Sequence, residues 1–116
     1  MRTTVCVAGD SILMKPMPEG YKDGEDLRAF IARGDARINN LEMVISDYDC
    51  HASTFCGGIW LTAEEARLDE ILSYGFNCFG FANNHTMDYS YGGLASTLAA
   101  LKLREVPVCG AGLSLS

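Results

Sequence analysis

Carboxylates, amides and one histidine stand at the ends of the apolar runs in this sequence, where a ligand site could form. They are Asp10, Asn40, Glu42, Asn83, Asn84, His85 and Asp88, and Gly110 follows the last run. A carboxylate in such a place can bind a hard metal ion, and a histidine can move a proton. The residue types therefore allow metal-assisted acid–base chemistry, provided that the fold gathers them.

The apolar runs before these residues predict the strands of a parallel sheet. Thr3–Ala8 and Phe76–Ala82 lack in/out alternation, which is typical of strands buried on both faces. Ala36–Ser46 fits either a strand and turn or a short helix, and we favour a strand at Ala36–Leu41; Val106–Cys109 predicts a last strand. Ligand sites form beyond the carboxyl ends of such strands, so the candidate residues could converge on one rim.

Three amphipathic stretches predict helices between these strands. The first has Asp23 as N-cap and Gly34 as terminator, and the second has a capping box at Thr62–Glu65 and Gly75 as its stop. Their apolar stripes recur at helical spacing: Leu27/Phe30/Ile31, Leu68/Ile71/Leu72 and Tyr91/Leu94/Leu98/Leu101. The alternation predicts an α/β fold with a mostly parallel sheet and flanking helices, in a single domain over residues 1–116. The segment 47–60 is expected to be irregular or to form a hairpin.

Composition narrows the class of protein. With 48% hydrophobic and 21% charged residues, the 116-residue chain is typical of a soluble globular domain. A net charge of -6 argues against a nucleic-acid partner. No apolar run is long enough to span a membrane, and residues 1–4 show no signal-peptide pattern, so we expect a cytoplasmic chain. Five irregularly spaced cysteines argue against a disulfide framework.

Several candidate residues also have a purely structural interpretation. Asp10 could form an Asx turn or a helix cap in its Gly-Asp-Ser bend. Asp88 could orient His85 or cap the helix that begins near Tyr91, and we slightly favour the cap. A soft-metal cluster of Cys50, His51 and Cys56 is disfavoured, because its spacing matches no standard zinc pattern.

Five motifs in order resemble a known family. They are Gly9–Met14, Asn40–Glu42, Phe81–Tyr89, Gly92–Leu94 and Gly110–Leu113. This set resembles the CapA-type poly-γ-glutamate capsule biosynthesis proteins, which are similar in turn to the calcineurin-like metallophosphoesterases. The resemblance runs over nearly the whole chain, and the block Ala82–Asp88 is its most specific part.

The resemblance implies the N-terminal half of a metallophosphatase-like α/β/β/α sandwich with a divalent-metal site. Asp10, Glu42 and Asn84 would be metal ligands, and His85, with Asp88, would be catalytic. Asn40, Asn83 and Gly110 would contact the substrate, which would be poly-γ-glutamate or a related anion. Oxygen ligands suit Mn²⁺, Mg²⁺ or Ca²⁺.

The sequence also departs from the phosphoesterase pattern. Ile12 stands where the first motif has a histidine, and Asn40–Glu42 stands near the usual Gly-Asp pair. The family continues beyond Gly112 with histidine-bearing motifs, so we expect a chain truncated at its C-terminus, inactive alone, with a weak or absent metal.

Two functions remain open at this point. One is metal-assisted hydrolysis or transfer by the full-length protein, and the other is a non-catalytic polymer-binding or scaffold role in capsule assembly. Family members are often anchored at the cell surface. A sheet that lacks its partner sheet leaves one apolar face uncovered, so we expect self-association, or cover from the segment 47–60.

Overall fold

A four-stranded parallel sheet organises the chain, in the order β1-β2-β5-β6. The computed structural model describes residues 1–22, 24–56 and 58–114. The sheet strands are β1 (Val5–Ser11), β2 (Ala36–Leu41), β5 (Cys78–Gly80) and β6 (Val108–Cys109), and a second, two-stranded sheet pairs β3 (Val44–Ile45) with β4 (Thr62–Ala63). The helices are α1 (Glu25–Ile31), α2 (Glu65–Leu72) and α3 (Ser90–Leu103). The predicted α/β class with a mostly parallel sheet is confirmed.

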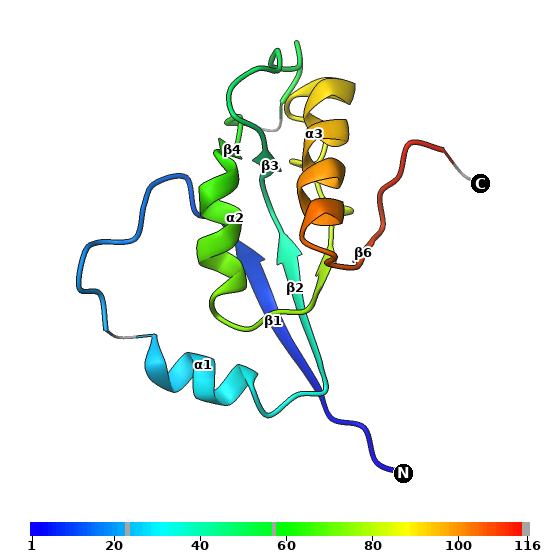
Figure 1. Cartoon of the computed structure of the whole chain (residues 1–116). Helices are drawn as coiled ribbons and strands as arrows, with labels where there is room; N and C mark the ends of the chain where they lie inside the picture. The colour runs from blue at the N-terminus through cyan, green and yellow to red at the C-terminus, as the bar shows by residue number, and fades with distance from the viewer. Residues whose placement is uncertain (23, 57, 115–116) are drawn as a thin grey trace.

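Helices α2 and α3 flank the strands and bury the core (Figure 1). Leu41 of β2 and Phe79 of β5 point to one face of the sheet, where they pack with Leu68 of α2 and Leu101 of α3. All four side chains are fully buried. The α2 stripe faces the core as predicted, and so does the α3 stripe from Leu94 to Leu101, since burial of an apolar stripe is what holds short helices in place. The prediction is wrong for Tyr91, which is 77% exposed, and for the α1 stripe, where Leu27 and Phe30 are 48% and 57% exposed.

The opposite face of the sheet is apolar and open near β1. Val5 and Val7 pair with Ala36 and Ile38 and are 56% and 68% exposed. The segment 47–60 does not cover these valines. Its described residues are irregular and lie at the other end of the molecule, beside the start of α3 (Figure 1).

Strand boundaries differ from the predicted ones at the site. β1 extends through Gly9 and Asp10 to Ser11, so Asp10 lies on the strand, paired with Asn40, rather than after it. A register shift between Val7 and Asp10 makes this extension possible, because a bulge re-aims the strand without ending it. β5 covers only Cys78–Gly80 of the predicted run, although the Phe81 N–H still donates to the Cys109 carbonyl at 2.8 Å.

Two of the predicted helix starts are not made by the residues named for them. The capping box at Thr62–Glu65 is wrong, because Thr62 belongs to β4 and its hydroxyl has no partner. Glu64 occupies the N-cap of α2 without a side-chain bond, and Asp47 Oδ1 accepts the Glu65 N–H at 3.2 Å instead. Asp23, the predicted cap of α1, lies outside the described residues.

The predicted helix stops agree better with the structure. Gly75 follows the end of α2 with φ +100, a conformation that glycine adopts without strain. Gly34 follows α1, where an added Cβ would lie 2.8 Å from Cys6 Cβ. Glycine is therefore needed at Gly34 for the close approach of the chain to β1.

Two chain-wide observations complete the fold. All five cysteines are free, with Cys6 buried and Cys109 exposed. Among the described residues, the structure contains no helix long and apolar enough to cross a lipid bilayer.

Candidate functional site

Two carboxylates meet on one amide group at the ends of β1 and β2. Asn40 Nδ2 donates to Asp10 Oδ1 at 2.8 Å and to Glu42 Oε2. The parallel register that pairs Asp10 with Asn40 puts these two residues side by side, and Glu42 follows directly after β2. Two negative charges thus lie around a single polarised N–H₂ group, an arrangement that favours a positive charge at this place.

Asn83 connects this carboxylate pair to the loop after β5. Its Nδ2 donates to Asn40 Oδ1 at 3.2 Å and to the Leu41 carbonyl at 2.8 Å. Because Asn40 Oδ1 accepts from Asn83, its amide nitrogen must face the carboxylates. The Asn83 Oδ1 accepts the His85 N–H at 3.0 Å, which makes an Asx turn. Asn83 therefore sets the orientation of Asn40 and the position of His85 together.

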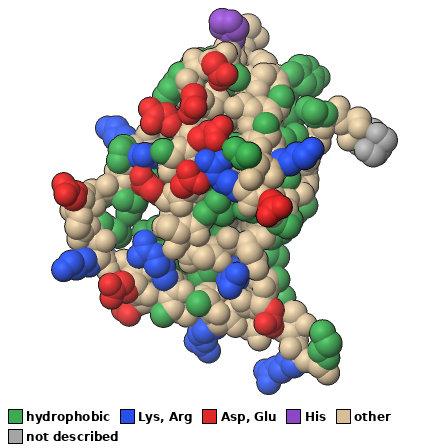
Figure 2. Space-filling model, viewed as in Figure 1, with side chains coloured by type: hydrophobic (Ala, Val, Ile, Leu, Met, Phe, Trp, Pro, Cys, Tyr) green, Lys and Arg blue, Asp and Glu red, His purple; other side chains and the backbone are tan. Residues whose placement is uncertain are grey.

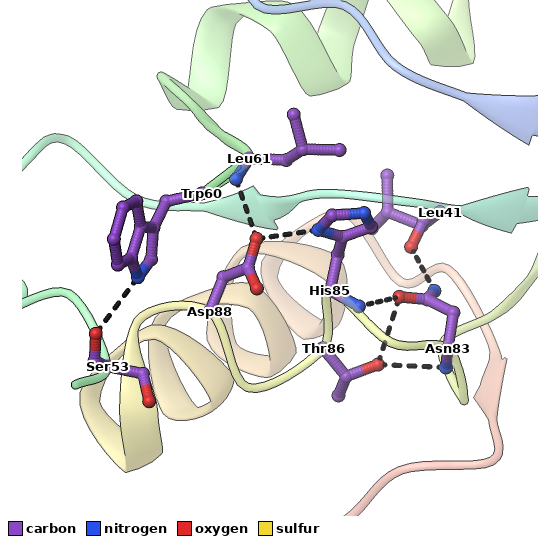
Figure 3. A network of polar contacts seen from close by, with 8 residues as sticks. All are labelled: Leu41, Ser53, Trp60, Leu61, Asn83, His85, Thr86 and Asp88. Atoms are coloured by element: carbon purple, nitrogen blue, oxygen red, sulfur yellow. Dashed lines mark hydrogen bonds and ion pairs between the residues drawn. The ribbon is translucent and has the colours of Figure 1, made fainter. Parts of the chain in front are cut away.

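His85 forms a close pair with the buried carboxylate of Asp88, as Figure 3 shows. His85 Nδ1 lies 2.7 Å from Asp88 Oδ2, and the two side chains are 12% and 2% exposed. The same Oδ2 accepts the Leu61 N–H at 2.7 Å. An ionised carboxylate accepts both bonds, so Nδ1 carries a proton and donates it, and Nε2 is the nitrogen left to act as base or, when protonated, as acid.

Asp88 does not cap α3, contrary to the interpretation that the sequence slightly favoured. Tyr89 occupies the N-cap without a side-chain cap bond. Burial, and then the negative charge of Asp88, raise the pKa of the Tyr89 phenol above its ordinary value of 10.0. The Asp88 carboxylate is turned toward His85 and Leu61 instead, which supports the orienting interpretation.

The segment before β4 is fastened to Asp88 as well. The Ser53 N–H donates to the Asp88 carbonyl at 2.7 Å, and Trp60 Nε1 donates to the Ser53 carbonyl at 3.0 Å (Figure 3). Asp88 thus holds this segment by its main chain at Ser53 and by its side chain at Leu61. The surroundings of His85 depend on residues more than twenty positions away in the sequence.

Asn84 and Gly110 lie at the margin of this network. The Asn84 side chain is exposed, next to the Asx turn. Gly110 has φ +88, and a Cβ at this position would lie 2.6 Å from Ala82 Cβ. Gly110 therefore lets the chain after β6 pack against the residue that precedes Asn83, which supports the loop that carries His85.

The donor set fits a hard divalent cation in kind but supplies few charged ligands. Asp10 and Glu42 offer carboxylate oxygens, and the neighbouring asparagines offer amide oxygens, which suit Mn²⁺, Mg²⁺ or Ca²⁺. Within residues 1–22, 24–56 and 58–114, no group of three or more His, Cys, Asp or Glu side chains could hold a metal ion. That finding also applies to the disfavoured cluster of Cys50, His51 and Cys56.

Two contributors to the site were not singled out from the sequence. Thr86 is buried, donates to the Phe81 carbonyl at 2.9 Å and accepts the Asn83 N–H at 3.1 Å. Its place three residues after an Asx-turn asparagine is a local pattern that could have revealed it. No sequence pattern identifies the Leu61 N–H, because the amino-acid sequence does not show which backbone donor will contact the site.

Comparison with known proteins finds a family match over nearly the whole chain. A family model described as bacterial capsule synthesis protein PGA_cap matches residues 4–116. Two proteins of Sinorhizobium fredii (strain NBRC 101917 / NGR234), described as uncharacterized proteins y4sH and y4uA, are each 26% identical to this chain over 116 residues. The match covers 96% of this chain and 25% of each relative, so the chain spans about a quarter of their length.

Proposed function

The chain belongs to the family of bacterial capsule synthesis proteins, and from this membership we propose that it carries the ligand-binding end of a metal-assisted hydrolase or transferase. The substrate would be poly-γ-glutamate or a related anionic polymer of the capsule. The observation that carries the proposal is the continuous network from the Asp10 and Glu42 carboxylates to the His85–Asp88 pair.

Asp10, Glu42 and Asn84 are the residues that would hold the metal. Two carboxylates on one amide nitrogen carry excess negative charge, which a divalent cation would compensate. When bound, such an ion polarises a phosphoryl or amide oxygen and lowers the pKa of a water molecule. It would also let an acidic chain of net charge -6 bind an anionic polymer.

His85 would move the proton in this reaction. Asp88 holds Nδ1 and so fixes the plane of the ring, which leaves Nε2 as the exchanging atom. Asn83 positions the backbone of His85 while also bonding Asn40, so that the acid–base group and the carboxylates keep a fixed relation. Asn40, Asn83 and Gly110 would contact the bound substrate.

Metal affinity of the chain itself is the direct test of the carboxylate pair. Titration of the purified chain with Mn²⁺ in a calorimeter should give binding weaker than micromolar, since two charged ligands make a weak site. Asp10→Asn and Glu42→Gln, which keep shape and remove charge, should each abolish this heat. The control Glu64→Gln changes an exposed glutamate away from the network and should leave it intact. Micromolar or tighter binding would contradict the weak site, and unchanged heat in both variants would refute the assignment.

Turnover in a longer protein that carries these residues tests His85. His85→Ala should lower the turnover rate about 10²-fold to 10⁴-fold, both with a phosphodiester and with a γ-glutamyl peptide, each assayed in the presence of Mn²⁺. His51→Ala replaces the other histidine of the chain, which is exposed, and should retain the rate of the unmodified protein. Equal rates for the two variants would remove His85 from the mechanism.

A non-catalytic role in binding the polymer is the second candidate. Ile12 is 51% exposed and offers no metal ligand, and the described residues contain no cluster of three charged or soft ligands. A scaffold would bind poly-γ-glutamate in the presence of Mn²⁺ and turn over neither substrate. Binding with turnover supports the enzyme, and binding without turnover supports the scaffold.

A further inference from the structure

A cavity lies between β1, α1 and α2, apart from the network just described. Its volume is about 300 Å³. Its lining includes the apolar or aromatic side chains of Leu13, Met17, Leu27, Ile71, Tyr74 and Phe76. Of the candidate-site residues it shares only Asp10. In Figure 2 the surface is hollowed on this side, between the loop after β1 and the body of the molecule. We call it the α1–α2 cavity.

One buried polar atom in this wall has no partner. Asn39 is 3% exposed and lines the α1–α2 cavity. Its Nδ2 donates to the Gly9 carbonyl at 2.9 Å, whereas its Oδ1 is buried without a hydrogen bond. The amide cannot be reversed, because Gly9 offers only an acceptor and two oxygens would then face each other. Buried acceptors are nearly always satisfied in folded proteins, so Asn39 Oδ1 marks a place for a donor.

We propose that the α1–α2 cavity binds a small uncharged molecule with an apolar, preferably aromatic, body and one N–H or O–H donor for Asn39 Oδ1. Among the described residues that line the cavity, Asp10 and Tyr74 are the only ionisable ones, so no lining side chain offers an anion a positive charge. Tyr74 and Phe76 favour a flat aromatic ring. The volume lies at the lower end of the range for small-molecule sites, about 300 to 1,000 Å³, which limits the ligand to a few rings or a short acyl chain.

The walls of the cavity are held in place without a ligand. The Met17 N–H donates to Glu70 Oε2 at 2.9 Å, and Glu70 also pairs with Arg67 at 3.0 Å, so the chain after β1 is fastened to α2. Arg28 of α1 lies 4.4 Å from the centre of the Tyr74 ring, which ties α1 to the end of α2. A preformed cavity of this kind binds a fitting ligand with little ordering cost.

Indole and indene test the proposal as a matched pair of probes. They have nearly the same shape, but only indole carries an N–H donor. Titrated into the purified chain and followed by NMR, indole should shift the methyl signals of Met17, Leu27 and Ile71. Indene should bind about tenfold more weakly, the difference that one hydrogen bond makes.

A filling variant locates the binding. Leu27→Trp places a large ring in the cavity from a residue that is 48% exposed, so the chain should fold, and indole binding should be lost. Leu103→Trp makes the same change at an exposed leucine of α3 and should bind indole as the unmodified chain does. Circular dichroism verifies that both variants are folded.

Three outcomes would overturn the proposal. Binding of neither probe would mean that an ordered water alone satisfies Asn39 Oδ1. Equal affinity for indole and indene would remove the donor requirement. Unchanged indole binding by Leu27→Trp would place the probe elsewhere. None of these results bears on the carboxylate and histidine network, because Mn²⁺ binding is measured independently of the cavity.

Discussion

A single carboxylate, that of Asp88, determines the surroundings of His85. One oxygen accepts from His85 Nδ1 and from the Leu61 N–H, and the residue is 2% exposed. Both donors are largely buried, since the His85 side chain is 12% and Leu61 is 3% exposed. The cost of its removal is therefore that of two unsatisfied groups rather than that of one hydrogen bond.

Asp88→Asn should lower the free energy of unfolding by about 1–3 kcal/mol, since an amide cannot accept from both donors with one neutral oxygen as well as a carboxylate does. Urea denaturation measures this loss. Asp49→Asn, at an exposed position, should change stability by less than about 0.5 kcal/mol. A loss of equal size in the two variants would mean that the buried carboxylate has no special structural role.

At this scale the sequence predicts which residues matter better than it predicts their partners. Asp10, Asn40, Glu42, Asn83, His85 and Asp88 could be named from their places after apolar runs, and the structure brings them together. The role of Asp88 was misjudged, because capping and orienting a histidine need the same residue type at the same spacing. Only the direction of the side chain, which tertiary packing sets, separates the two.

Helix α3 depends on one of its two adjacent glycines. A Cβ on Gly93 would lie 2.5 Å from Tyr89 Cβ and 2.9 Å from Val44 Cγ1, because α3 packs directly on β3. A Cβ on Gly92 would meet Cys50 Sγ at 3.4 Å, which is ordinary contact. The two positions therefore make a matched pair in one helix.

Gly93→Ala should destabilise the fold by about 1–3 kcal/mol through overpacking. Gly92→Ala should stabilise it by up to about 1 kcal/mol, because alanine favours helix over glycine. Thermal unfolding of both variants checks the opposite signs. A gain in stability for both would show that α3 can move away from β3 at little cost.

Helices α2 and α3 are joined by an ion pair that should respond to acid. Arg104 Nε donates to Asp69 Oδ1 at 2.6 Å, and Nη1 donates to Glu65 Oε2 at 2.9 Å. In Figure 2 acidic and basic side chains intermix over α2. The hydrogen bond from Arg104 holds the pKa of Asp69 below its ordinary value of 3.8, although partial burial opposes the shift.

Asp69→Asn should cost less than about 1 kcal/mol at neutral pH, because the Asp69 side chain is 59% exposed and solvent screens the pair. A carboxyl whose pKa is lower in the folded than in the unfolded state stabilises the fold above 3.8 and loses this effect as the pH falls through its folded-state pKa. The difference between the variant and the unmodified chain should thus shrink below pH 3.8, as measured by urea unfolding at stepped pH. A difference that stays constant to lower pH would exclude the ion pair as its cause.

Local patterns predict the elements where the determining contacts are local. The apolar stripes of α2 and α3 follow from apolar residues spaced three and four positions apart. The end of α2 follows from Gly75, a glycine that adopts a positive φ there. The start of α2 could not be predicted, because Asp47 reaches the Glu65 N–H from 18 residues away. The extension of β1 to Ser11 likewise depends on pairing with β2. The apolar residues of β1 itself do not indicate where this pairing ends.

The whole molecule presents an apolar sheet face next to β1. Val5 and Val7 are 56% and 68% exposed, and the described residues of the segment 47–60 leave them uncovered. A second copy of the chain is the simplest cover, so we expect concentration-dependent self-association in solution.

Val7→Lys should weaken this association about tenfold, which corresponds to losing the burial of one valine. Multi-angle light scattering over a range of concentrations measures the effect. Leu103→Lys, at an exposed leucine of α3, should associate as the unmodified chain does. A strict monomer at every concentration for the unmodified chain would contradict the expectation.

The global class follows from composition and alternation, whereas the long-range arrangement does not. Apolar runs alternating with amphipathic stretches predicted the α/β class, and the family match supports the resemblance seen in the motifs. The position of Ser53 against Asp88 could not be anticipated, because nothing in an irregular segment specifies which strand end it will contact.

The parallel sheet also has a kinetic consequence. Asp10 and Asn40 are 30 residues apart in the chain, and Asn40 and Asn83 are 43 apart, yet hydrogen bonds join them. Contacts between residues so far apart in the sequence form only after large loops have closed. The chain entropy lost in closing these loops slows folding. While the polypeptide is still collapsing, its carboxylates are ordinary hydrated charges. The network of carboxylates and amides exists only once the crossover between β2 and β5 has docked.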